Sequence, residues 1–211
     1  MFKGAIFDMD GTILESMGIW RDITLKFMAE RNFTITDDEL MIYKDMTVEE
    51  SMPAIKEKYN LPETAEELKA EFSRLGYNAY MYEVQAKPYI KEYMQKLKRE
   101  GVKIAIATSG YRTLCEGAMK RLGMLDMIDA FALSSEVGVN KSNPDVYLLA
   151  AERIGIEPSE CMVFEDILIG INGAKKGGMQ TTAIYDFSNE EDTGLLKKTA
   201  DRYITGWKEL L

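Results

Sequence analysis

The fold is decided by the stretch Phe2-Lys3-Gly4-Ala5-Ile6-Phe7-Asp8-Met9-Asp10-Gly11-Thr12 at the beginning of the chain. Its apolar run from Gly4 to Phe7 has the length and composition of a strand that is buried on both faces of a parallel sheet. Asp8 and Asp10 follow where such a strand would end. Ligands of open α/β sheets bind outside the carboxyl ends of the strands, so the stretch predicts two carboxylates at the mouth of a crevice.

The spacing of the two aspartates leaves two arrangements open. If the chain stays extended through Met9, both side chains face the same side of the sheet. If Gly11 starts a turn early, Asp8 presents its side chain and Asp10 its backbone carbonyl to one cation. In both arrangements the close carboxylates repel each other, so a cation or a shared proton must compensate. Taken alone, Asp-x-Asp-Gly is also typical of a strand followed by a hairpin turn.

Length, composition and charge limit the kinds of protein that the chain can be. Its 211 residues suit one large domain or a core with an insert, and 46% apolar and 29% charged residues are typical of a soluble globular protein. The apolar runs are too short to span a membrane and the first residues lack a signal-peptide pattern, so we expect a cytoplasmic protein without a membrane partner. The formal net charge of -9 argues against nucleic acid as a partner. We expect a monomer, with a dimer as the alternative.

The chain contains no histidine, which excludes several classes of active site. Nucleophiles paired with histidine are excluded, and so is the usual histidine-containing zinc site. Cys115 and Cys161 are too few for a zinc cage and stand in apolar segments, which is typical of buried, reduced thiols. Any metal is therefore expected to be a hard cation bound by oxygen atoms, with Mg²⁺ first.

The pattern of apolar residues divides the chain into two parts. Residues 17–84 carry helical spacing and predict four helices and no strand; their capping-box patterns are Thr36-x-x-Glu39, Thr47-x-x-Glu50 and Thr64-x-x-Glu67. From residue 85 onward strands alternate with helices. The predicted strands are 102–107, 130–133, 161–164, 181–185 and 203–204, and the predicted helices include 89–100, 111–122 and 144–154.

Strands that alternate with helices are typical of a doubly wound parallel sheet. We therefore predict an α/β fold with a Rossmann-like catalytic core, residues 1–16 and 85–211, and an inserted all-helical cap, residues 17–84. In the core, we expect a loop over residues 134–143, and a helix for which Asn143 is the N-cap and Pro144 the first residue.

Polar side chains follow four of the predicted strands, at the point where each strand ends. They are Asp8 and Asp10 after the first, Thr108 and Ser109 after the second, Lys141 in the loop after the third, and Glu165 and Asp166 after the fourth. Each has a structural explanation by itself, such as helix capping for Thr108 or solvation for a loop lysine. Because the carboxyl ends of parallel strands meet at one edge of a sheet, all of them together predict one site.

These motifs resemble those of the haloacid dehalogenase superfamily of phosphohydrolases, in the branch with a helical cap, like β-phosphoglucomutase. The matching segments are Phe7-Asp8-Met9-Asp10-Gly11-Thr12, Ile106-Ala107-Thr108-Ser109, Lys141-Ser142-Asn143-Pro144-Asp145 and Val163-Phe164-Glu165-Asp166, with Gly170-Ile171 and Gly177-Gly178-Met179. The resemblance covers residues 1–16 and 86–187, whereas the cap matches only in position, size and helical character. Many relatives have glycine before the loop lysine and proline after it, where this chain has Asn140 and Ser142. The difference puts the rigidity of the loop in doubt more than its function.

The resemblance implies a role for each of these residues. Asp8 would be the nucleophile that forms an aspartyl-phosphate, and Asp10 the acid and base for the leaving group and for water. An aspartate needs no histidine to activate it, because its carboxylate is ordinarily ionised at neutral pH. Thr108, Ser109 and Lys141 would bind the phosphoryl group, so that the implied catalytic set is Asp8, Asp10, Thr108 and Lys141. The implied Mg²⁺ ligands are Asp8, the Asp10 carbonyl, Asp166, and Glu165 directly or through water.

The function implied by the resemblance is an Mg²⁺-dependent phosphatase that acts on a small phosphorylated metabolite. A sugar-phosphate mutase like β-phosphoglucomutase is the alternative enzyme. A receiver-type phospho-accepting domain is less favoured, because receivers carry their aspartate after a middle strand and have no large helical insert. Asp10 favours phosphate esters over haloacids, since a halide leaving group needs no proton. The sequence does not predict which phosphorylated substrate is used.

Overall fold

The computed structural model describes residues 2–43, 46 and 48–211. The chain divides into two compact units, one formed by residues 1–16 and 84–211 and the other by residues 17–83. The second junction lies one residue before the boundary expected from the sequence. We call the first unit the core and the second the helical unit.

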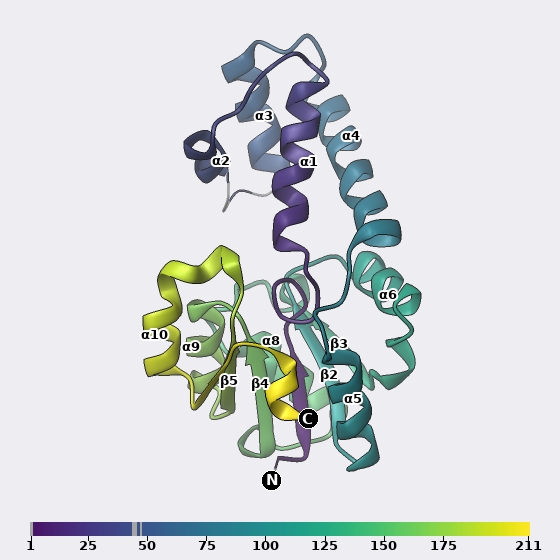
Figure 1. Cartoon of the computed structure of the whole chain (residues 1–211), viewed down its shortest axis with the longest axis vertical. Coiled ribbons are helices and arrows are strands. Elements are labelled where there is room, and N and C mark those ends of the chain that lie inside the picture. The colour runs from purple at the N-terminus through teal and green to yellow at the C-terminus, as the bar shows by residue number, and fades with distance from the viewer. Residues whose placement is uncertain (1, 44–45, 47) are drawn as a thin grey trace. The chain divides into compact units, whose positions relative to one another are not determined.

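The core is built on one parallel sheet of six strands (Figure 1). The strands are β1 (Gly4–Phe7), β2 (Lys103–Thr108), β3 (Ala130–Leu133), β4 (Cys161–Glu165), β5 (Gln180–Ile184) and β6 (Arg202–Ile204), and their order is β3-β2-β1-β4-β5-β6. In this register Phe7 lies opposite Ile106 and Phe164. The strand order reverses at β1, so the carboxyl ends of β1, β2 and β4 lie side by side at the switch point where ligands of such sheets bind. The predicted doubly wound α/β fold is confirmed.

Helices and short helical turns connect the strands of the core. The α-helices are α5 (Ile90–Arg99), α6 (Arg112–Arg121), α7 (Ser134–Val137), α8 (Asp145–Ile154), α9 (Leu168–Lys176) and α10 (Thr193–Thr199), and the 3₁₀ turns are η2 (Leu125–Met127), η3 (Pro158–Glu160), η4 (Phe187–Asp192) and η5 (Trp207–Leu210). Small and β-branched residues of the central strands, such as Ile6, Ala105 and Val163, pack against α8. Because side chains alternate along a strand, the next residues of β1 and β4 face the opposite side of the sheet.

That opposite side is packed with aromatic rings. Phe7 and Phe164 are stacked at 4.6 Å between ring centroids, and Tyr93 and Trp207 cover them at 5.3–6.4 Å. Aromatic rings bury a large apolar area and prefer such offset and edge-on contacts. The indole nitrogen of Trp207 also donates to the Thr12 carbonyl oxygen at 3.1 Å. The aromatic cluster therefore holds both β1 and the loop that follows it, where the two aspartates lie.

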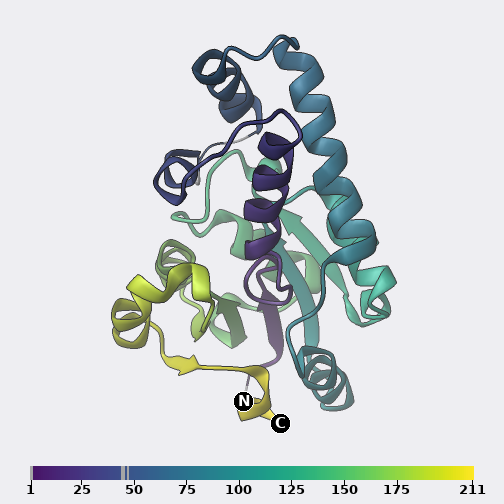
Figure 2. The same cartoon turned by 45° about the horizontal axis from the view of Figure 1, so that its top comes forward.

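The helical unit consists of α1 (Met17–Ala29), α2 (Asp37–Tyr43), α3 (Val48–Tyr59) and α4 (Ala65–Asn78), and continues from α4 into a π-helical turn, η1 (Ala79–Glu83). Helix α4 lies beside α1 and α3, as Figures 1 and 2 show. The buried residues of the unit form its own apolar cluster, which includes Phe27, Met52 and Leu68. Thr64 and Glu67 form the predicted capping box of α4, and Thr36 and Glu39 form the one before α2. The predicted box at Thr47 lies outside the described residues.

Three local predictions for the core differ from the structure. The expected loop 134–143 contains the short helix α7, in which Glu136 accepts a hydrogen bond from the Leu133 amide at 2.9 Å. Four residues are too few to produce a periodic pattern, so no sequence signal indicates this turn. Helix α8 begins at Asp145 with Pro144 as its N-cap, one residue later than predicted. Tyr89, the first residue of the predicted helix 89–100, precedes α5 in a left-handed conformation (φ 68°).

None of the helices that the structure describes is long and apolar enough to cross a membrane.

Candidate active site

Three carboxylates meet where β1 and β4 end. One oxygen atom from each of Asp8, Glu165 and Asp166 lies within 4.8 Å of the other two. All three residues are buried, with exposed fractions of 6%, 0% and 1%. Burial raises the pKa of Glu165 and of Asp166, and the neighbouring Asp8 charge raises both further. Each additional negative charge here is costly, so the cluster favours a cation between the three carboxylates.

Lys141 supplies one such cation from the loop after β3. Its ammonium group donates to Oδ1 of Asp8 and to Oε1 of Glu165, the latter at 2.5 Å. The Lys141 side chain is only 5% exposed. Burial alone would lower the pKa of Lys141, but Asp8 and Glu165 raise it above its ordinary value, so the group stays charged. Three carboxylates with one ammonium still leave a site that attracts further positive charge.

The loop that carries Lys141 is held by its neighbours although it lacks the usual glycine and proline. The side-chain oxygen of Asn140 accepts from the amide and the hydroxyl of Ser142, at 3.1 and 2.6 Å. Lys176 of α9 donates to the Ser142 carbonyl at 2.8 Å. A Cβ atom on Gly173 would lie 2.0 Å from the Lys141 carbonyl oxygen, so only glycine allows the loop to lie against α9. These contacts fix the backbone on both sides of the lysine.

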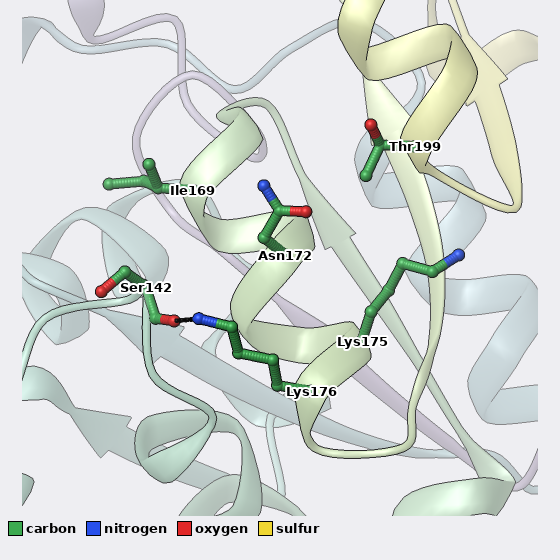
Figure 3. A pocket seen from close by; sticks show the side chains of 6 residues that line it. All are labelled: Ser142, Ile169, Asn172, Lys175, Lys176 and Thr199. Carbon is green, nitrogen blue, oxygen red and sulfur yellow. Dashed lines mark hydrogen bonds between the residues drawn. The ribbon is translucent and has the colours of Figure 1, made fainter.

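A groove of about 600 Å³ lies beside α9, next to this loop (Figure 3). Its lining residues are Ser142, Ile169, Asn172, Lys175, Lys176 and Thr199. The lining contains none of the site residues predicted from the sequence. Both of its lysines have partners, since Lys176 binds the Ser142 carbonyl and Lys175 pairs with Asp201 at 2.7 Å. The groove therefore lies beside residues that hold the Lys141 loop in place, and it is separate from the carboxylate cluster.

Tyr147 of α8 is part of the site, although the sequence did not single it out. Its hydroxyl group donates to Oε1 of Glu165 at 2.7 Å, and Tyr147 is fully buried. A Cβ atom on Gly170 would lie 2.6 Å from Glu165 Oε1 and 2.8 Å from the Tyr147 hydroxyl, so the glycine leaves room for this pair. Oε1 of Glu165 thus receives donors from both Lys141 and Tyr147. The carboxylate is fixed in the orientation that holds the ammonium group on Asp8.

Asp10 is placed differently from Asp8. It is only partly buried, and its Oδ1 accepts a hydrogen bond from the Ser16 hydroxyl at 2.6 Å. Among the described residues, the carboxylate cluster is formed without the Asp10 side chain. The amides of Ile13 and Leu14 both donate to the Met9 carbonyl at 2.9 Å, so the chain turns directly after Met9. Of the two arrangements that the sequence left open, the structure has the early turn.

Thr108 and Ser109 end β2 with different surroundings. Thr108 is buried and its hydroxyl oxygen accepts from the Gly110 amide at 2.9 Å, and the same hydroxyl group also interacts with the Cys115 thiol. The Ser109 side chain is exposed and shares a hydrogen bond with the Ser134 hydroxyl at 3.1 Å. Burial, with a contribution from Asp10 and Asp8, raises the pKa of the nearby Cys115 thiol to about 12, so this cysteine is a neutral neighbour of the site.

The donor set fits Mg²⁺. The three clustered atoms are carboxylate oxygens, which Mg²⁺ prefers. Asp166 accepts one hydrogen bond on each oxygen, from Thr12 and from Asn189, so each oxygen keeps a lone pair for a cation. The backbone at Gly11 lies close to Asp166, and only glycine fits there. Its φ is +80°, and a Cβ atom at this position would lie 2.3 Å from Asp166 Oδ2. Asp8, Glu165 and Asp166 could therefore hold the ion with their side chains. The Asp10 carbonyl stays a predicted ligand, because the cluster is defined by side-chain atoms alone.

Comparison with known proteins identifies the family. Residues 5–184 match the family model of haloacid dehalogenase-like hydrolases. The chain is 28% identical over 180 residues to a bifunctional riboflavin kinase/FMN phosphatase of Arabidopsis thaliana; the match covers 85% of this chain but 47% of that protein, so the chain spans about half of it. It is 23% identical over 178 residues to a phosphorylated carbohydrates phosphatase of Thermotoga maritima, with 84% of this chain and 82% of the relative covered.

Among solved structures, the β-phosphoglucomutase of Clostridium difficile superimposes with a TM-score of 0.75 at 20% identity, over 100% of this chain and 94% of that one. At this identity the similarity shows the fold. The family model, in contrast, spans the first strand, the Lys141 loop and the end of β4, which are the segments that carry the predicted motifs. The chain belongs to the haloacid dehalogenase-like hydrolase family, which confirms the superfamily of phosphohydrolases that its motifs predict.

Proposed function

We propose that this hydrolase is an Mg²⁺-dependent phosphatase that hydrolyses a small phosphorylated metabolite through a phosphorylated Asp8. The observation that carries the proposal is the placement of Asp8, a buried carboxylate that contacts the Lys141 ammonium group and lies beside Glu165 and Asp166. A nucleophile that attacks a dianionic phosphate must be surrounded by positive charge, because the two anions otherwise repel each other. Lys141 provides part of that charge.

In the first step, an oxygen of Asp8 attacks phosphorus and the bond between phosphorus and the ester oxygen breaks. The leaving alkoxide takes a proton from Asp10, whose side chain is oriented by the Ser16 hydroxyl. The Thr108 hydroxyl and the Lys141 ammonium group bind phosphoryl oxygens. Mg²⁺, when bound, would neutralise charge on the phosphoryl group and on the carboxylates that hold the ion.

In the second step, Asp10 removes a proton from a water molecule, whose oxygen attacks the phosphorus of the aspartyl-phosphate. The bond between phosphorus and Asp8 breaks, inorganic phosphate leaves, and the Asp8 carboxylate is restored. Covalent catalysis of this kind divides one difficult displacement into two easier ones. No histidine is required at either step, in keeping with a chain that has none.

The substrate class is proposed from the relatives. One acts by name on FMN and another on phosphorylated carbohydrates, and both kinds of substrate are small phosphate monoesters. The chain's net charge of -9 disfavours a nucleic-acid substrate. We therefore propose a small phosphorylated metabolite, with sugar phosphates as the first group to be tested.

The proposal predicts that activity and thermal stability both depend on Mg²⁺. Phosphate release from a panel of sugar phosphates, nucleotides and phosphorylated acids should require Mg²⁺ and be lost with a chelator. At a Mg²⁺ concentration of about 100 Kd, binding to the folded state contributes about 2.7 kcal/mol, which should raise Tm by roughly 5 °C or more. NaCl at matched ionic strength is the control for the thermal shift. Activity that resists the chelator, or equal shifts in both salts, would contradict the metal site.

The same panel separates the phosphatase from a mutase. A mutase would interconvert sugar phosphates and would release phosphate only slowly unless a bisphosphate were present. Steady release of phosphate without a bisphosphate supports the proposed function. Interconversion without release would replace it with the mutase alternative, which uses the same nucleophile.

Loss of the hydrogen bond from Tyr147 should lower kcat, because this bond fixes the Glu165 carboxylate that accepts from the Lys141 ammonium group. Tyr147→Phe removes one hydroxyl from the fully buried ring, and outer-shell changes of this kind typically cost about 10–100-fold in activity, here expected in kcat. Tyr93→Phe, which removes the hydroxyl of another buried tyrosine in the core, is the matched control. If Tyr147 acts through Glu165, its effect should vanish in a Glu165→Ala background, because alanine has no side-chain oxygen to accept the hydrogen bond from Tyr147. Equal losses in both backgrounds would show that Tyr147 acts by another route.

A further inference from the structure

The carboxylate of Asp166 is held on both of its oxygen atoms by side chains from distant parts of the core. Thr12 donates its hydroxyl proton to Oδ1 at 3.0 Å, from the loop after β1. Asn189 donates from its side-chain amide to Oδ2 at 2.8 Å, from the turn after β5. Asp166 itself is 1% exposed, so these donors replace the water molecules that would otherwise solvate its charge. Thr12 lies in the first of the family motifs, but nothing in the sequence marks Asn189.

The turn that carries Asn189 is itself fixed by a buried ion pair. Asp186, the N-cap of η4, accepts from the amide and the hydroxyl of Ser188 on its Oδ1, at 3.0 and 2.6 Å. Its Oδ2 pairs with Lys87 at 2.9 Å, and the side chains of Lys87 and Asp186 are only 11% and 4% exposed. The Asn189 backbone is non-helical within this turn (φ -121°, ψ 26°), and its amide donates to the Asp186 carbonyl at 3.1 Å. The conformation of the turn therefore depends on Asp186 and its partners.

Lys87 is connected to both sides of Asp166. Its side chain binds Asp186 and the Tyr185 carbonyl, the latter at 2.7 Å, on the side of Asn189. Its backbone amide donates to the Ile13 carbonyl at 2.8 Å, one residue after Thr12. The two segments that supply hydrogen bonds to Asp166 are thus tied to one residue, which lies close to the junction between the core and the helical unit.

We propose that Asn189 is a positioning residue for Asp166, and that the Lys87–Asp186 ion pair holds Asn189 in place for this role. The hydrogen bond from Asn189 to Oδ2 fixes the orientation of the Asp166 carboxylate relative to Asp8 and Glu165. Hydrogen bonds to ligating carboxylates orient the ligands, and their removal typically weakens a metal site. This inference rests on the proposed function, because it takes Mg²⁺ to bind at the three carboxylates.

Calorimetric titration of the full chain with Mg²⁺ tests the role of Asn189 without measuring activity. Asn189→Ala should raise the Kd for Mg²⁺ by about 10–100-fold, since it leaves Oδ2 of Asp166 without its donor. The matched control is Asn172→Ala, which changes an asparagine of the same unit that lines the groove beside α9 (Figure 3). Its Kd should equal that of the unchanged protein. An unchanged Kd in Asn189→Ala would overturn the inference.

The role of Lys87 is tested by combining variants. Lys87→Met keeps the backbone amide that binds Ile13 but removes the charge that binds Asp186, so it should also raise the Kd. If it acts through Asn189, the double variant should bind Mg²⁺ as Asn189→Ala does, within about twofold. If the double variant instead raises the Kd by the product of the two single effects, Lys87 acts independently of Asn189 and that part of the inference is wrong. If Lys87→Met does not fold, Asp186→Asn removes the same ion pair and gives the same comparison.

The outcomes separate this inference from the proposed function. If the unchanged protein does not bind Mg²⁺, the metal requirement of the proposed function fails, and the inference fails with it. If the unchanged protein binds Mg²⁺ and Asn189→Ala binds it equally well, only the inference fails. A weaker site in Asn189→Ala with an unaffected Asn172→Ala supports both.

Discussion

Replacement of Asp8 by asparagine is expected to abolish turnover and the phosphoenzyme together, with a loss of at least about 10⁴-fold in kcat. The amide oxygen is a poor nucleophile, so the first bond to phosphorus does not form. The substitution also removes one of the three carboxylates that lie within 4.8 Å of one another, so Mg²⁺ should bind more weakly. Lys141 loses a charged partner but keeps Glu165, which should hold it in the site.

Quenched-flow kinetics and mass spectrometry measure both effects. The peptide that contains Asp8 should gain one phosphoryl group in the unchanged enzyme during turnover and none in the variant. Asp126→Asn, which neutralises an exposed carboxylate of the core, is the matched control and should keep full activity. Normal turnover in Asp8→Asn, or a phosphoryl group on another residue, would remove Asp8 from the role of nucleophile.

Much of the core could be predicted because its segments are simple to interpret. The run from Gly4 to Phe7 is apolar throughout and forms a strand with all four residues buried. A parallel sheet brings the carboxyl ends of its strands to one edge, so Asp8, Glu165 and Asp166 had to lie near one another once the strands were assigned. Lys141 could be placed at the same edge because its loop follows the third strand, but its role could be given only through the resemblance to a family.

The supporting residues could not be predicted, for reasons that are physical. Tyr147 occupies an inward position of an amphipathic helix, where an aromatic residue is ordinarily explained by packing, and its hydroxyl partner depends on the tertiary fold. Ser16 and Asn189 are small polar residues near turns, which is where such residues are common in any protein. Their contacts with Asp10 and Asp166 join segments whose separation is fixed by the packing of the core. Contacts of this kind leave no local pattern in the sequence.

The loop around Lys141 shows how a departure from a family pattern can be compensated. With serine in place of proline after the lysine, the backbone gains an amide that donates to Asn140, and with asparagine in place of glycine it gains the acceptor. The Lys176 side chain then binds the Ser142 carbonyl from α9. Side-chain hydrogen bonds thus supply constraints that a fixed proline ring would otherwise supply. The sequence shows the departure, but only the structure shows the compensation.

Replacement of Asp10 by asparagine should impair catalysis in a different way from replacement of Asp8. The new side-chain amide would keep an oxygen that accepts from the Ser16 hydroxyl, and the backbone would be unchanged, so the loop after β1 should retain its shape. The variant would lose the ability to give or take a proton at this position. General acid and base help is typically worth about 10²–10⁴-fold in rate, and the loss in kcat should lie in this range for substrates with an alkoxide leaving group.

The choice of substrate separates the two steps that Asp10 serves. An aryl phosphate has a leaving group that needs little protonation, so phosphorylation of Asp8 in Asp10→Asn should remain fast while hydrolysis of the aspartyl-phosphate is slow. Rapid mixing should then show a burst of aryl alcohol close to one per enzyme, followed by slow turnover, and mass spectrometry should find a phosphoryl group on the peptide with Asp8. An alkyl phosphate should give no burst, because its first step needs the proton of Asp10. Equal rate losses for the two substrates without a trapped phosphoenzyme would show that Asp10 supports the site in some way other than proton transfer.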